Sequence, residues 1–85
     1  MVKVVDFYAD WCPPCKMMAP LIEELEKELV GKVEFEKVNI DENQSRAAQN
    51  NVMSIPTYLV MENGKEKNRL VGATSKDEFL KFIFK

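Results

Sequence analysis

The chain has 85 residues, which is enough for one small domain and leaves no room for a second. Its 12 basic and 14 acidic residues give a net charge of −2, so no excess of positive charge points to nucleic acid as a partner. Hydrophobic residues make up 46% of the chain, as in ordinary globular proteins. We therefore expect a single domain over residues 1–85.

The first predicted element is a buried strand over residues 2–8. Its residues are mostly β-branched or aromatic and apolar on both faces, interrupted only by Lys3 and Asp6. No basic leader or signal segment precedes it, and no apolar run is long enough to span a bilayer. We expect a soluble cytoplasmic protein that does not associate with membranes.

A helix is predicted to follow, beginning near Pro13 or Pro14. Pro20 lies inside this pattern, and because it has no N–H we expect it to kink the helix, leaving the first turns as a short separate segment. Gly31 is expected to end the helix. The residues at helical spacing that supply its apolar face are Met18, Leu21, Ile22, Leu25 and Leu29.

The next predicted elements are a strand over residues 33–40 and a short helix over residues 41–49, with Asn51 in the left-handed conformation that ends it. Two strands joined through a helix form a parallel, right-handed βαβ unit. This part of the chain therefore predicts an α/β protein.

The remaining residues predict a hairpin and a last helix. Strands over residues 57–61 and 67–71 are joined by Asn63-Gly64, a strong signal for a tight antiparallel turn. Ser75 to Glu78 matches a capping box at the start of a helix. Its apolar face consists of Phe79, Leu80, Phe82 and Ile83. The whole order is β-α-β-α-β-β-α, with a four-stranded mixed sheet flanked by helices.

Both cysteines, Cys12 and Cys15, lie where the first strand gives way to the first helix. They can close a small disulfide, and the helix dipole at this point favours a thiolate over a thiol. A structural cross-link with so short a loop contributes little stability. Zinc requires about four ligands, yet there is no histidine and no third cysteine, and Lys16 occupies the histidine position of a haem-attachment motif. The pair therefore favours redox chemistry without a metal.

The following segments resemble known sequences in order and spacing: Val5 to Lys16, Ala19-Pro20, Val38 to Asp41, Ile55 to Thr57, Asn63-Gly64 and Val71-Gly72. They resemble the thioredoxin family, and the resemblance implies a thioredoxin-like fold. Two features depart from that family. Thioredoxins usually have an additional strand and helix before the buried strand, and they usually carry Gly-Pro between the cysteines. Pro13-Pro14 is similar to the dipeptide of tryparedoxins, nucleoredoxins and some periplasmic thiol reductases.

The resemblance implies that Cys12 is the attacking thiolate and Cys15 the resolving thiol. We expect Cys12 to lie closer to solvent and Cys15 to be more buried, which would keep the pKa of the Cys15 thiol high. Since Pro13 and Pro14 have no N–H, the N–H of Cys15 is the expected backbone donor to the Cys12 sulfur.

Asp6 is costly in an apolar strand unless it has a role or a partner, because burial disfavours an unpaired carboxylate. In thioredoxins an aspartate at the matching place is thought to take the Cys15 proton, and Lys37 matches a lysine near that aspartate. The alternatives are an aspartate at a strand end facing solvent and an ordinary surface lysine.

Pro56 stands at the start of a predicted strand, which a simple edge-strand proline would also explain. The resemblance implies that the Ile55–Pro56 peptide bond is cis. It implies a flat apolar patch around the sulfurs, which a target polypeptide contacts, against the alternative that Trp11 belongs to the core. The expected substrate-binding residues are Trp11, Pro13, Ile55, Pro56, Gly72 and Ala73.

The expected function is reduction of protein disulfides by thiol–disulfide exchange, in a monomer. No glycine-rich loop is present to bind a nucleotide, so electrons must arrive from a separate donor of the thioredoxin-reductase type. No cofactor is expected beyond the redox-active cysteine pair. Two alternatives are a glutaredoxin-like protein that uses glutathione and a non-catalytic thioredoxin-fold module with an idle cysteine pair.

Overall fold

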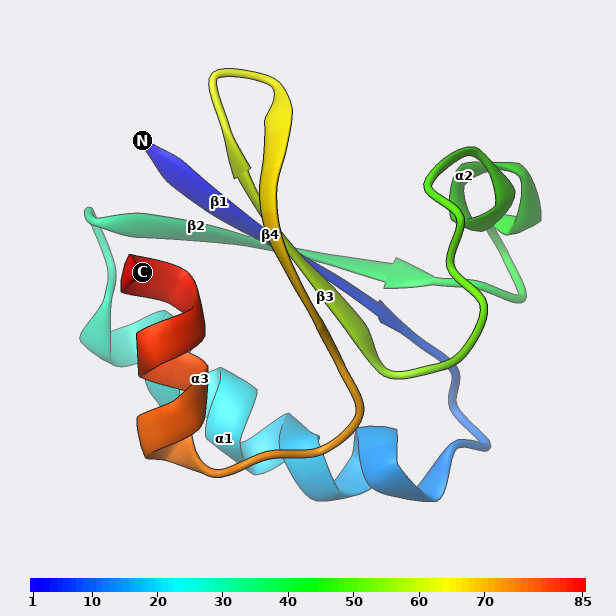
Figure 1. Cartoon of the computed structure of the whole chain (residues 1–85). Coiled ribbons are helices and arrows are strands. Elements are labelled where there is room, and N and C mark those ends of the chain that lie inside the picture. The colour runs from blue at the N-terminus through cyan, green and yellow to red at the C-terminus, as the bar shows by residue number, and fades with distance from the viewer.

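The computed structural model describes residues 1–85, and its elements follow the predicted order (Figure 1). The strands are β1 (Val2–Tyr8), β2 (Val33–Asn39), β3 (Thr57–Glu62) and β4 (Lys65–Val71). The helices are α1 (Pro13–Glu28), α2 (Gln44–Gln49) and α3 (Lys76–Phe84). The bounds differ from the predicted ones by no more than a turn of helix.

The four strands form one sheet in the order β2-β1-β3-β4. β1 pairs in parallel with β2, whereas β3 is antiparallel to both β1 and β4, so the sheet is mixed as predicted. Asn63 and Gly64 join β3 to β4, and both have positive φ angles, 55° and 78°, as the predicted tight hairpin turn requires.

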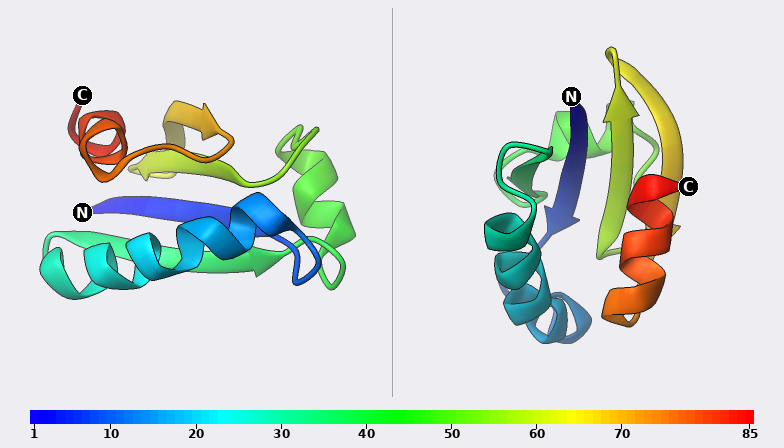
Figure 2. Two further views of the ribbon diagram at one scale, coloured as in Figure 1. Left: turned by 90° about the horizontal axis from the view of Figure 1, so that it is seen from below. Right: turned by 90° about the vertical axis from the view of Figure 1, so that its left-hand side faces the viewer.

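The alternation of side chains along β1 builds two cores, one on each face of the sheet. Val4 packs with buried residues of α1 and α3, whereas its neighbour Val5 packs on the opposite face with Phe7, Val38 and Leu59. Figure 2 shows α1 and α3 running beside the sheet, with the short α2 near the end of the sheet where β2 finishes. The larger core therefore lies between the sheet and the two longer helices.

Helix α1 begins directly after Cys12, because Pro13 and Pro14 occupy its first two positions, where a backbone N–H is not needed. The helix continues as one element through Pro20, so the prediction of a short separate segment is wrong. It ends at Glu28, and Gly31, with a φ angle of 82°, lies in the turn that follows. The cysteines are thus held by a helix with a long buried face.

The ends of the other helices follow the sequence signals closely. Asn51 takes the predicted left-handed conformation after α2, with a φ angle of 56°. The Ser75 hydroxyl accepts a hydrogen bond from the Glu78 N–H at 3.2 Å, whereas the Glu78 carboxylate pairs with Lys81 at 3.6 Å. Only one half of the predicted capping box therefore forms.

Phe79 on α3 offers a test of the larger core. It is fully buried, and its ring packs edge-on against Tyr58 and Phe82. Phe79→Ala leaves a cavity there, so we expect the free energy of unfolding to fall by about 3–5 kcal/mol. Urea denaturation of the oxidised protein measures this loss. Phe84→Ala, at an exposed position of the same helix, is the control and should change it by about 0.5 kcal/mol or less; equal losses would contradict the prediction.

Candidate active site

The two cysteines form a disulfide at the start of α1, with Cα atoms 5.2 Å apart. Cys12 is the N-cap residue of the helix, and its sulfur accepts a hydrogen bond from the Cys15 N–H at 3.2 Å. The predicted backbone donor is therefore confirmed. Because the positive end of a helix dipole favours negative charge, this position stabilises a thiolate on Cys12 once the disulfide is reduced.

The predicted difference in exposure between the two cysteines is wrong. Cys12 is 2% exposed and Cys15 8%, so Cys12 is not closer to solvent. Cys12 is covered because Ile55 packs against the cysteines, with its carbonyl oxygen 3.8 Å from the Cys12 sulfur. The position of Cys12 at the helix N-terminus, rather than exposure, distinguishes the two sulfurs.

A small cavity of about 110 Å³ adjoins Cys15 and not Cys12. The residues that line it are Asp6, Tyr8, Cys15, Ala19 and Lys37. Asp6 and Lys37 are paired residues of the parallel strands β1 and β2, so their side chains leave the sheet on the same face. The structure thus brings Asp6, Lys37 and Cys15 together around one cavity.

Two of the cavity residues, Tyr8 and Ala19, lie in the segments that carry the resemblance but were not predicted as site residues from the sequence. Once a site around Asp6 and Cys15 is assumed, the spacing of each residue in the sequence places it at that site. Tyr8 lies two residues after Asp6, on the same face of β1. Ala19 lies four residues after Cys15, on the same side of α1.

Asp6 is only 7% exposed, and its Oδ1 atom is buried without a hydrogen-bond partner. Burial raises the pKa of the Asp6 carboxyl group to about 6, because the charged form loses its hydration. The positive charge of Lys37 opposes this rise, and the negative charge of Glu26 adds to it. The interpretation of Asp6 as a solvent-facing aspartate is therefore wrong, and its carboxyl group changes protonation state close to neutral pH.

Lys37 is exposed, and its Nζ atom lies 3.7 Å from Oε1 of Glu26 on α1. It makes no ion pair with Asp6 within 4.0 Å. The positive charge that acts on Asp6 is therefore paired with a different carboxylate.

The loops before β3 and after β4 meet beside the sulfurs. The Ile55–Pro56 peptide bond is cis, and the Gly72 N–H donates a hydrogen bond to the Pro56 carbonyl oxygen at 2.9 Å. Pro56 is fully buried, which corrects its predicted place in the surface patch. It is covered because it leads directly into the buried start of β3 and is bound to the loop after β4. Ala73 is exposed, and Ile55 and Gly72 are half-buried.

Trp11 is 62% exposed, so it does not belong to the core. Its indole Nε1–H donates a hydrogen bond to Oδ2 of Asp41 at 2.8 Å, which ties the loop after β1 to the loop after β2. Asp41 was not assigned this function from the sequence, where it appeared only in the Val38 to Asp41 segment. Pro13 is also exposed beside Cys12. An exposed aromatic ring thus flanks the disulfide in a fixed orientation.

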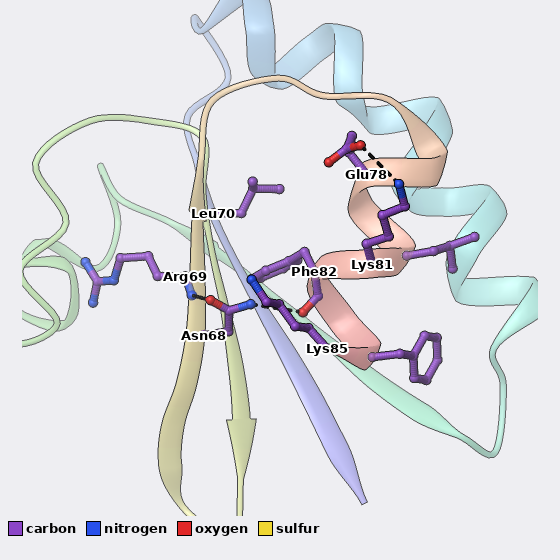
Figure 3. A pocket seen from close by; sticks show the side chains of 9 residues that line it. Asn68, Arg69, Leu70, Glu78, Lys81, Phe82 and Lys85 are labelled. Atoms are coloured by element: carbon purple, nitrogen blue, oxygen red, sulfur yellow. Dashed lines mark hydrogen bonds and ion pairs between the residues drawn. The ribbon is translucent and has the colours of Figure 1, made fainter.

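The largest hollow of the molecule lies elsewhere, between β4 and α3, with a volume of about 820 Å³ (Figure 3). It contains no cysteine, and two of its charged residues, Glu78 and Lys81, pair with each other. No group of three or more His, Cys, Asp or Glu residues is placed to hold a metal ion. None of the helices combines the length and the apolar character needed to cross a membrane.

A disulfide that caps a helix, with a buried carboxyl group behind its second sulfur, is the site of a thiol–disulfide oxidoreductase. The Thioredoxin family model matches residues 1–85. Thioredoxin of Rickettsia conorii is 45% identical over 82 residues, which are 96% of this chain and 78% of that protein. Thioredoxin of Haemophilus influenzae is 48% identical over 80 residues, 94% of this chain and 75% of that protein.

Solved structures agree with these relatives. Thioredoxin of Fasciola hepatica superposes with a TM-score of 0.91 at 41% identity, covering 98% of this chain and 78% of that one. Thioredoxin NaTrxh from Nicotiana alata gives a TM-score of 0.91 at 43% identity, covering 98% of this chain and 70% of that one. The chain belongs to the thioredoxin family. The predicted fold and the predicted activity of a thiol–disulfide oxidoreductase are confirmed, and the comparisons favour neither alternative function.

The raised pKa of Asp6 predicts how stability depends on pH. Between the usual aspartate pKa of about 3.9 and the folded value of about 6, the folded protein binds more protons than the unfolded chain. Stability should therefore fall as pH rises through this window, and the full cost is present above it. Asp6→Asn removes the ionisable group, so we expect the free energy of unfolding at pH 7.5 to rise by about 1–3 kcal/mol.

Urea denaturation of the oxidised proteins at pH 4 and pH 7.5 measures both effects of Asp6→Asn. The gain should be present at pH 7.5 and much smaller at pH 4, since at the lower pH the wild-type carboxyl group is protonated in the folded protein and still about half protonated in the unfolded chain. Asp10→Asn, at an exposed position, is the matched control. Identical pH dependence in wild type and Asp6→Asn would show that Asp6 is solvated.

Proposed function

We propose that this protein is a reductase of disulfide bonds in other proteins, and that the two cysteines divide the work. The observation that carries the proposal is the asymmetry of the pair. The Cys12 sulfur accepts the Cys15 N–H at the start of α1, whereas Cys15 lines the cavity that holds the buried carboxyl group of Asp6. One sulfur is therefore placed for attack as a thiolate and the other for losing its proton later.

In the first step, the Cys12 thiolate attacks one sulfur of a target disulfide. A bond forms between the Cys12 sulfur and that target sulfur, the target S–S bond breaks, and the second target sulfur leaves as a thiolate. In the second step, the Cys15 thiol passes its proton to Asp6, and the resulting thiolate attacks the Cys12 sulfur. The Cys12–Cys15 disulfide forms, the mixed disulfide breaks, and the target has gained two electrons.

Asp6 is suited to this proton transfer because its pKa of about 6 lies near neutral pH, where a general base is most effective. A cavity of about 110 Å³ between Asp6 and Cys15 has room for water, through which the proton can pass. Lys37 lines the same cavity, and its positive charge favours the ionised form of Asp6. We propose Cys12, Cys15 and Asp6 as the catalytic residues, with Lys37 acting on Asp6.

The target polypeptide is proposed to contact the loops that surround the sulfurs. Trp11, Pro13 and Ala73 supply exposed surface there, and Ile55 and Gly72 are partly accessible. The Ile55 carbonyl oxygen lies beside the Cys12 sulfur, two residues before the start of β3, so an extended target segment can pair with the backbone at this point. Buried Pro56 supports this surface from below.

We further propose that residues 1–85 act as a single monomeric domain in the cytoplasm, where paired thiols are more often catalytic than structural. Electrons would come from a separate donor protein of the thioredoxin-reductase type, since the chain has only three glycines and no glycine-rich loop for a nucleotide. The redox-active Cys12–Cys15 pair would be the only redox group.

Trapping with insulin as the target tests the division of labour. Cys15→Ser retains the attacking thiolate and lacks the resolving thiol, so it should accumulate mixed disulfides with insulin chains. Cys12→Ser lacks the helix-capping sulfur and should trap at least about tenfold less in the same time. Non-reducing electrophoresis with mass spectrometry quantifies the adducts. Equal trapping by both variants would contradict the assigned roles, and failure of the wild type to accelerate insulin reduction by dithiothreitol would contradict the proposed function.

A further inference from the structure

Two charged side chains line the cavity next to Cys15, and a third from another element is paired with one of them. Asp6 on β1 and Lys37 on β2 are paired in register, and Glu26 on α1 lies 3.7 Å from the Lys37 ammonium group. Glu26 follows Ala19 by seven residues, two turns of helix, so both lie on the same side of α1. Glu26 does not line the cavity itself, and Lys37 lies between it and the site.

We propose that Glu26 is a positioning residue, which holds the Lys37 ammonium group on the α1 side of the cavity and away from the Asp6 carboxyl group. Lys37 makes an ion pair with Glu26 and none with Asp6, although Asp6 is its partner in the sheet. The flexible side chain of a lysine can reach either carboxylate. Glu26 therefore decides which of the two carboxylates receives the positive charge.

This arrangement affects the basicity of Asp6. Its effect on the rate of disulfide reduction rests on the proposed function, in which Asp6 accepts the Cys15 proton. An ammonium group in contact with Asp6 would stabilise its carboxylate and lower its pKa, which would make it a weaker base. Glu26 prevents this contact, and its own negative charge acts in the same direction. Both effects keep the proton affinity of Asp6 high.

The other groups that face Asp6 carry no charge in the oxidised protein. Tyr58 is its neighbour on β3, and burial raises the pKa of Tyr58 well above its usual value, so it stays neutral. Cys15 is in the disulfide, and Tyr8 lines the same cavity. Of the remaining glutamates of α1, Glu24 and Glu28 form ion pairs with Lys76, and Glu23 is exposed to solvent. Lys37 and Glu26 are thus the charges that act on Asp6.

Titration of the Asp6 carboxyl carbon by NMR in the oxidised protein tests the proposal without any activity assay. Glu26→Gln should lower the Asp6 midpoint by about half a pH unit or more, because Lys37 is released and one repulsive charge is lost. Glu23→Gln is the matched control, with the same charge change on an exposed part of the same helix, and should leave the midpoint within about 0.1 pH unit. An unchanged or higher midpoint in Glu26→Gln would overturn the proposal.

A double-mutant cycle with Lys37→Gln separates positioning from direct repulsion. Lys37→Gln alone should raise the Asp6 midpoint, since an attractive charge is removed. If Glu26 acts through Lys37, its replacement in the Lys37→Gln protein should shift the midpoint by less than half of the shift seen in the wild type. A shift of full size in that background would show that Glu26 acts by its own charge, and the positioning role would be wrong.

The pH dependence of insulin reduction then distinguishes this inference from the proposed function. If Asp6 accepts the Cys15 proton, Glu26→Gln should move the acidic midpoint of the rate profile down by the shift seen in the titration, with a lower rate at neutral pH. A titration that shifts while the rate profile does not would support positioning by Glu26 and refute Asp6 as the proton acceptor. A wild-type profile that follows Asp6, with no shift in the Glu26→Gln titration, would refute the inference alone.

Discussion

The parallel pairing of β1 with β2 is the constraint on which the site depends. It places Asp6 and Lys37 side by side on one face of the sheet, and α1, which crosses between these two strands, returns along that same face with Cys15 turned toward them. A shift of β1 by one residue would turn Asp6 to the opposite face, toward Val38 and Leu59, and remove it from the cysteines. The same pairing that builds the larger core therefore also builds the redox site.

The site combines a stabilised sulfur with a destabilised carboxyl group. Cys12 receives a hydrogen bond and the field of the helix, whereas Asp6 lies in a place where its charged form has lost its water and Oδ1 has no partner. A fold that tolerates such a carboxyl group must offset its cost elsewhere, and the aromatic cluster around Phe79 lies in the same layer of the molecule. The packing around Phe79, which stabilises the fold, thus lies in the same layer as Asp6, which destabilises it.

Sequence patterns predicted the elements well because each has a local physical signal: the β-branched and aromatic run of β1, the positive φ angles of Asn63-Gly64 and Asn51, and the hydroxyl cap of Ser75. They failed where the outcome depends on segments distant in the chain. The burial of Cys12 comes from Ile55, and that of Pro56 from the loop that ends β4. The Trp11–Asp41 and Lys37–Glu26 pairs likewise join separate elements, and no local pattern specifies them.

Cys12 takes the place that serine or aspartate usually occupies at the start of a helix, and this couples the redox state to the backbone. A thiolate is a stronger hydrogen-bond acceptor than a disulfide sulfur, so reduction should tighten the bond from the Cys15 N–H and order the first turn of α1. Transfer of electrons to a target should loosen that turn again. The rate of hydrogen exchange at the Cys15 amide would then report whether the protein is reduced or oxidised.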